Sequence, residues 1–130
     1  GESMMTFLDR FGEPAYALLR IFAGLLFLAH GVQKLFAFPA AFPMPLTPML
    51  TAAAVIELVA GTLIVIGLFT RPAAFLASGM AAVGYWTVHA ANGFYPIANG
   101  GETIALYCFV FLFIATRGAG IWSVAAAMRR

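Results

Sequence analysis

Long apolar segments alternate with short polar or proline-rich segments along this chain, and their lengths predict membrane-spanning helices. The apolar segments cover about residues 15–36, 49–69, 73–91 and 102–116. About 20 apolar residues, at a rise of roughly 1.5 Å each, cross the hydrocarbon layer of a bilayer. The pattern therefore predicts an all-α membrane protein, an antiparallel bundle of four transmembrane helices forming a single integral-membrane domain over residues 1–130.

Proline and glycine mark the ends of these segments. Pro14 suits the first turn of a helix, whereas the prolines between residues 39 and 48 break helical continuity. We expect Pro72 to open the third helix, and the Asn- and Gly-rich stretch 92–101 to separate it from the fourth. The fourth helix should begin at Glu102, with a tail that stays helical to Met128.

The composition supports lipid as the solvent of this chain. Hydrophobic residues make up 63% of it and charged residues 9%, against roughly 45–50% and 25% in soluble domains. The formal net charge of +2 arises from seven basic residues spread along the chain, which argues against nucleic-acid binding. A lone Cys108 excludes an intrachain disulfide or a CxxC redox pair.

Basic residues also predict the orientation. Lys34 is expected toward the outer side, and the arginines at the other side are Arg10, Arg20, Arg71, Arg117, Arg129 and Arg130. Because cytoplasmic ends carry the excess of Lys and Arg, both termini should be cytoplasmic. Gly1–Ser3 precede Met4 and are expected to be an expression remnant, and no cleavable signal pattern follows, so the first span should persist in the mature protein.

Ionisable residues interrupt the apolar segments, and they are the candidate site. They are Arg20, His30, Lys34, Glu57 and His89. Each such group costs about 2.5–3.5 kcal/mol at membrane depth unless it faces a partner or water. Helical spacing puts the three basic residues of the first span on one face. We expect His30, Glu57 and His89 to meet in an outer-side polar pocket that also includes Lys34, Asn92 and Glu102.

The catalytic candidates are His30, Glu57 and His89, and each has a structural alternative. Imidazole titrates near neutral pH, so the two histidines could exchange protons or bond a quinone carbonyl, or simply form interhelical hydrogen bonds. Glu57 could transfer a proton or only neutralise His30 or Lys34. Metal ligation by the two histidines with Glu57 and Glu102 is chemically allowed, but no compact ligand motif supports it, and no metal is predicted.

Residues that would bind a cofactor or anion are Arg20, Lys34, Asn92 and Glu102. Lys34 could attract an anion or snorkel to the interface, and Glu102 could link the pocket to water or only stabilise a helix dipole. Snorkelling to headgroups is the preferred interpretation of Arg20. Small residues should let the spans approach closely, and those concerned are Gly24, Gly31, Gly61, Gly67 and Gly79.

The order of short motifs over the hydrophobic segments resembles the DoxX family of small bacterial membrane proteins. The motifs in the first half are Leu19-Arg20, Gly24, Phe27, His30-Gly31, Gln33-Lys34-Leu35, Glu57, Gly61, Gly67-Leu68 and Thr70-Arg71. Those in the second half are His89, Asn92-Gly93-Phe94, Asn99-Gly100-Gly101-Glu102 and Leu106-Tyr107. That family is similar to the DoxD membrane component of thiosulfate:quinone oxidoreductase.

The resemblance implies a subunit of the bacterial cytoplasmic (inner) membrane that works with a respiratory or redox-stress system. The leading hypothesis is a redox-associated subunit whose polar pocket binds a quinone or a small anion and handles protons. The chain carries no haem-attachment or iron–sulfur motif, so a soluble or membrane oxidoreductase subunit would be its partner, beside membrane lipid and other copies of the chain. The rival hypotheses are a transporter of a small solute or protons, and a non-enzymatic scaffold for a soluble oxidoreductase.

Overall fold

A computed structural model describes residues 2–129 of the chain, with side chains described from residue 5 onward. All regular secondary structure in that range is helical. The helices are α1 (Glu2–Asp9), α2 (Gly12–Phe36), α3 (Pro48–Ile66), α4 (Thr70–Gly84), η1 (Tyr85–His89), η2 (Ala90–Asn92), α5 (Pro96–Asn99), α6 (Glu102–Arg117) and α7 (Val124–Met128). The predicted helical class is confirmed.

Helix ends differ from the expected boundaries where the backbone turns left-handed. α3 stops at Ile66 because Gly67 takes φ 71° and its N–H returns to the carbonyl of Leu63. α4 then begins at Thr70, so Pro72 lies in its first turn instead of opening the helix. The expected helical tail is interrupted, because Gly118 and Gly120 adopt positive φ and separate α6 from α7, which ends at Met128 as expected.

The third helical segment changes its winding near its end. α4 is α-helical to Gly84, η1 is a π-helix, and η2 is a 3₁₀ turn, so the chain stays helical from Thr70 to Asn92. Wider π turns are rare and shift the side chains that follow relative to an ideal α-helix. An alignment at 100 degrees per residue therefore fails for His89, which ends η1.

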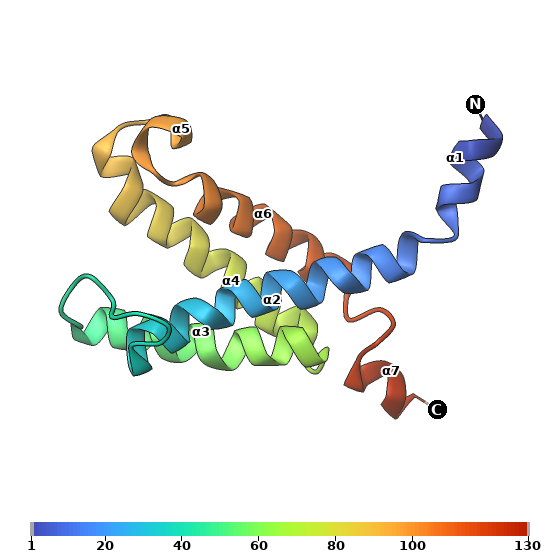
Figure 1. The fold of residues 1–130 in the computed structure, drawn as a ribbon, viewed down its shortest axis with the longest axis horizontal. Coiled ribbons are helices and arrows are strands. Elements are labelled where there is room, and N and C mark those ends of the chain that lie inside the picture. The colour runs from blue at the N-terminus through green and yellow to red at the C-terminus, as the bar shows by residue number, and fades with distance from the viewer. Residues whose placement is uncertain (1, 130) are drawn as a thin grey trace.

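Two helical hairpins make up most of the molecule. α2 packs along α3, and α4 packs along α6, with smaller contacts between α3 and α4 and between α2 and α6. Figure 1 shows the hairpins close together where α3 leads into α4 and diverging toward the loop 37–47 and α5. The two ends that the sequence placed around one pocket therefore lie apart.

Close approach within the α2–α3 hairpin depends on glycine, as the sequence predicts. A Cβ atom at Gly31 would lie 2.7 Å from the carbonyl oxygen of Ala54, and one at Gly61 would lie 2.9 Å from the backbone nitrogen of Leu28. The same prediction is wrong for Gly79, which has open space around it. The hairpin that carries Lys34 and Glu57 is therefore held at backbone distance.

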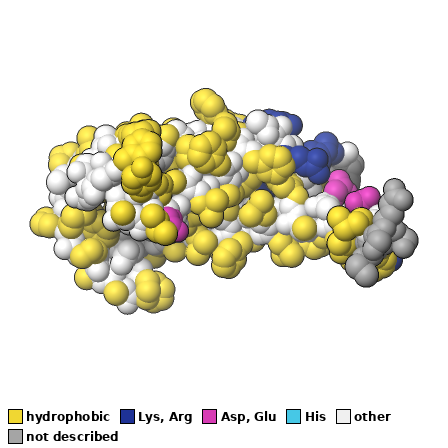
Figure 2. All heavy atoms as spheres, turned by 90° about the horizontal axis from the view of Figure 1, so that it is seen from above, with side chains coloured by type: hydrophobic (Ala, Val, Ile, Leu, Met, Phe, Trp, Pro, Cys, Tyr) yellow, Lys and Arg dark blue, Asp and Glu magenta, His cyan; other side chains and the backbone are white. Residues whose placement is uncertain are grey.

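The burial pattern is that of a protein in lipid. Phe27, Ile64 and Phe111 form the centre of a small apolar core, yet Arg20 and Glu57 are also buried. Large hydrophobic side chains cover the outside, as Figure 2 shows for one face. α2 and α3 are long and apolar enough to cross a membrane. Charge inside and an apolar surface reverse the arrangement expected in water.

Candidate functional site

Arg20 on α2 is fully buried, and every hydrogen bond that it makes to a described residue goes to a backbone oxygen. Its Nε donates to the carbonyl oxygen of Ile64 at 3.0 Å, and its Nη2 donates to the backbone carbonyl oxygen of Trp122 at 2.7 Å. Further acceptors are the carbonyls of Val65, Ala119 and Ile121. The expected snorkelling is therefore wrong, since the side chain is 0% exposed. Arg20 joins the end of α3 to the segment between α6 and α7.

Two neighbouring contacts strengthen the same end. The Tyr16 hydroxyl donates to the carbonyl of Gly118 at 2.6 Å, and Arg71 donates to the last carbonyls of α6, on Ala115, Thr116 and Arg117. These carbonyls lack partners within the helix, so an arginine satisfies them and also complements the helix dipole. We call this region, with Arg20, Arg71 and Arg117, the arginine end.

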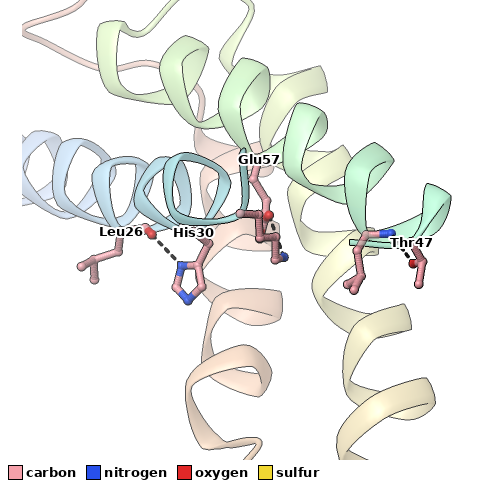
Figure 3. A network of polar contacts seen from close by, with 6 residues as sticks. Leu26, His30, Thr47 and Glu57 are labelled. Atoms are coloured by element: carbon pink, nitrogen blue, oxygen red, sulfur yellow. Dashed lines mark hydrogen bonds and ion pairs between the residues drawn. The ribbon is translucent and has the colours of Figure 1, made fainter. Parts of the chain in front are cut away.

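Lys34 and Glu57 form an ion pair at the other end of the α2–α3 hairpin. The Lys34 Nζ lies 2.8 Å from Glu57 Oε1, and their side chains are 12% and 6% exposed. Figure 3 shows Glu57 reaching from α3 toward α2. The Phe42 ring lies 5.7 Å from the ammonium. Of the two partners proposed for Glu57, the structure selects Lys34.

His30 lies near this pair without bonding to it. Its Nδ1 is 2.8 Å from the carbonyl oxygen of Leu26 on the same helix, and the side chain is exposed (Figure 3). Its ring stands edge-on to Tyr107 of α6, with centroids 6.0 Å apart. Two contacts therefore lie at this end of α2: Lys34 pairs with Glu57 of α3, and His30 packs on Tyr107 of α6.

Tyr107 did not emerge as a site residue from the sequence. It was noted only within a family motif, although Tyr107, Phe111 and Ile114 recur at helical spacing on the face of α6 that packs inward. Tyr107 stacks on Phe111, with centroids 5.5 Å apart. The helical spacing of large side chains in the fourth span could have identified Tyr107, because it puts this residue on the face of α6 that packs against Phe27 of α2.

The remaining predicted site residues lie on the other hairpin. His89 Nδ1 is 3.3 Å from the carbonyl oxygen of Asn99, Asn92 is exposed, and Glu102 opens α6 in an exposed position. The expected meeting of His89 with His30 and Glu57 is therefore wrong, because the hairpins diverge at these ends (Figure 1).

A separate hydrogen-bond network around Asn99 holds the loop beside His89. Asn99 Nδ2 donates to the Tyr85 hydroxyl at 3.0 Å and to the Gly93 carbonyl at 2.9 Å, while its Oδ1 accepts from the Gly101 N–H at 2.8 Å. The Tyr85 hydroxyl in turn donates to the Phe94 carbonyl. These are bonds that shape a loop. Within the described part of the chain, no three His, Cys, Asp or Glu side chains gather as metal ligands would.

Comparison with known proteins gives the family. The DoxX family model matches residues 15–90, more than half of the chain. An uncharacterized protein of Haemophilus influenzae is 41% identical over 127 residues, covering 89% of this chain and 92% of that protein. An uncharacterized membrane protein of Mycobacterium tuberculosis is 30% identical over 132 residues, covering 87% of this chain and 80% of that protein. No solved structure matches significantly. The chain belongs to the DoxX family and is a membrane protein.

Proposed function

We infer that this protein is a four-span subunit of the bacterial cytoplasmic membrane that binds a quinone and exchanges protons beside the Lys34–Glu57 pair. Helices α2 and α3 are long enough to span, and the continuous helical segment from Thr70 to Asn92 exceeds the length that a bilayer requires. α6, with 16 residues, is about 24 Å long at a rise of 1.5 Å per residue. It is the shortest of the proposed spans.

The distribution of charge supports an orientation with both termini in the cytoplasm. Arg20, Arg71 and Arg117 lie at the end where α3 leads into α4 and α6 ends, and Lys34 lies toward the opposite end of α2. Figure 2 shows basic side chains gathered at one end of the face in view. Cytoplasmic ends of spans carry such an excess, which supports a position of the Lys34–Glu57 pair toward the outer side.

The buried Lys34–Glu57 pair is the observation on which the proposed chemistry rests. Ion pairs in an apolar interior are expensive to bury, and in membrane segments they mark sites of binding or proton transfer. The nearby groups fit a quinone head. Lys34 and Tyr107 carry donors for carbonyl oxygens, and the Phe42 and Tyr107 rings offer apolar faces.

Reduction of a quinone to a quinol takes up two electrons and two protons. Glu57 and His30 carry groups that can transfer protons. The sequence contains no haem-attachment or iron–sulfur motif that could carry electrons. The electrons would therefore come from an oxidoreductase partner, soluble or membrane-bound. Lys34 would orient the carbonyl oxygen and stabilise negative charge that develops on it.

Equilibrium binding tests this function on the full chain in nanodiscs. A short-chain ubiquinone and a menaquinone analogue are titrated against the native protein, Glu57→Gln and Glu102→Gln. We expect Glu57→Gln to weaken binding at least about tenfold, because the Lys34 ammonium loses the charge-assisted contact that holds it in place for the quinone carbonyl, and Glu102→Gln to leave it unchanged. Thermal unfolding of each variant verifies that the fold persists.

Equal affinity of the native protein and Glu57→Gln for both quinones would contradict the proposal. Proton or anion flux through liposomes, without quinone binding, would assign the pair to transport instead. If the protein copurifies with an oxidoreductase but binds neither quinone, it acts as a scaffold for that enzyme.

A further inference from the structure

A cavity of about 530 Å³ lies at the arginine end, away from the Lys34–Glu57 pair. It opens where α4 begins and α6 ends, and both charged and apolar residues line it. The side chains that bear on the argument are Glu13, Thr70, Arg71, Arg117 and Arg129. None of them belongs to the proposed quinone site.

The cavity has an excess of positive charge. Three arginines and one glutamate line it, a balance of +2, and no described ion pair joins Glu13 to an arginine. Arg71 is engaged with the carbonyls at the end of α6. Arg117 stands over the Tyr16 ring at 5.2 Å, and among the described residues its guanidinium has no hydrogen-bond partner. Arg117 and Arg129 are both exposed and free to bind an anion.

A buried hydroxyl group in the cavity wall also lacks a partner. Thr70 is 5% exposed, and its Oγ1 has no hydrogen-bond partner among the described residues. Thr70 is the first residue of α4, where backbone N–H groups lack acceptors within the helix and the helix dipole favours an anion. Pro72 has no N–H, and the Ala73 N–H donates to the carbonyl of Phe69. The donors at this wall are therefore the N–H groups of Thr70 and Arg71 and the enclosed Thr70 hydroxyl.

We propose that this cavity binds a phosphate group, carried by an anionic phospholipid or free in solution. Arg117 and Arg129 bind its oxygens, the backbone N–H groups of Thr70 and Arg71 and the Thr70 hydroxyl donate further hydrogen bonds, and the Arg71 guanidinium adds positive charge while it caps α6. Phosphate suits this donor set because guanidinium forks match its geometry. The volume exceeds that of a bare phosphate, so a phosphodiester with its headgroup also fits.

The test measures two phosphate sources on the full chain at constant ionic strength. Nanodiscs of phosphatidylcholine alone are compared with nanodiscs containing phosphatidylglycerol, and inorganic phosphate is titrated into the first kind. Native mass spectrometry counts retained phosphatidylglycerol, and thermal unfolding reports stabilisation. Retention of phosphatidylglycerol supports the proposal with a lipid as the source, and saturable stabilisation by inorganic phosphate supports it with a soluble anion. No response to either source would overturn it.

Matched variants distinguish a site from general surface charge. Arg117→Gln should weaken binding about tenfold and Thr70→Val about threefold, as expected for one charged and one neutral hydrogen bond. Arg10→Gln removes the same charge from an exposed arginine that stacks on Phe7, and it should change little. Equal losses in Arg10→Gln and Arg117→Gln would show diffuse attraction and overturn the proposal. Thr70→Val replaces an unpaired hydroxyl with a methyl group of similar size, so its fold should persist.

Discussion

The two ends of the α2–α3 hairpin use charge in opposite ways. At the arginine end, Arg20 donates every described hydrogen bond to a backbone carbonyl. At the other end, Lys34 bonds to the side chain of Glu57. Both arrangements bury charge, but the first joins backbone segments, whereas the second joins two groups that can each gain or lose a proton.

This difference separates structure from candidate chemistry. Guanidinium stays protonated at any physiological pH and offers five donors in a rigid plane, which suits carbonyls at helix ends. Lysine, glutamate, histidine and tyrosine can exchange protons when their surroundings change. A buried arginine that bonds only to carbonyls is therefore a structural residue, and the Lys34–Glu57 pair is the better place to seek function.

Loss of Arg20 should have the largest effect on stability. Arg20→Met leaves buried carbonyls at the end of α3 and between α6 and α7 without donors, which should cost at least about 3 kcal/mol. Arg20→Lys should recover only part of this, because an ammonium cannot reach the same set of acceptors. Chemical unfolding in detergent measures both variants, with Arg10→Met as the exposed control. A change in Arg20→Met no larger than that of the control would contradict the structural role.

Disruption of the ion pair should come next. Glu57→Leu leaves the Lys34 ammonium buried without its partner, at a cost of about 2–3 kcal/mol. The double variant Lys34→Met/Glu57→Leu should regain most of that stability, because apolar groups can replace a buried pair. A double-mutant cycle on unfolding free energies, with Glu57→Leu and Lys34→Met as the single variants, measures the coupling. Simple additivity of the two single effects would mean that the pair does not interact.

Quinone binding can be measured on the same variants to separate stability from function. The double variant should bind quinone as weakly as Glu57→Leu. It regains stability, but it still lacks the polar groups of Lys34 and Glu57 that are proposed to act on the quinone. Recovery of affinity together with stability would reduce the pair to a structural contact.

An intermediate effect is expected at the loop network. Asn99→Ala removes bonds to Tyr85, Gly93 and Gly101, and it should destabilise the loop by about 1–2 kcal/mol. Hydrogen–deuterium exchange should then accelerate over residues 93–101 and stay unchanged in α2 and α3. The exposed Asn92→Ala is the control. Faster exchange across both hairpins would show that this loop also supports the ion-pair region.

The smallest effect on stability is expected at His30. The side chain is exposed, and among the described residues it hydrogen-bonds to its own helix alone, so His30→Asn should change the unfolding free energy by less than about 0.5 kcal/mol. Under the proposed function, the same variant should still slow the proton uptake that accompanies reduction of bound quinone by added dithionite, which stopped-flow measurement with a pH indicator follows. A large loss of stability would assign His30 to the fold.

Much of the fold could be predicted from the sequence because helix length and apolar content are local properties. The long helices, the loop prolines and the close approach at Gly31 and Gly61 followed from the pattern alone. The helix end at Gly67 was missed by three residues, since a left-handed turn depends on what packs against it, whereas the end of the fourth span before Gly118 was predicted to within one residue. The π-helix before His89 was also missed, and it changes where that imidazole points.

Local pattern therefore determined that this chain is helical, prefers lipid and carries charge inside its apolar segments, because each of these follows from the transfer free energy of residues taken in order. Only the tertiary structure decided which charges meet. Arg20 donates to carbonyls more than forty positions away, and Glu57 pairs with Lys34. His89 lies on the other hairpin, which diverges from the first at that end. Partner choice depends on how helices cross, and the crossing is set by the packing of all the helices together.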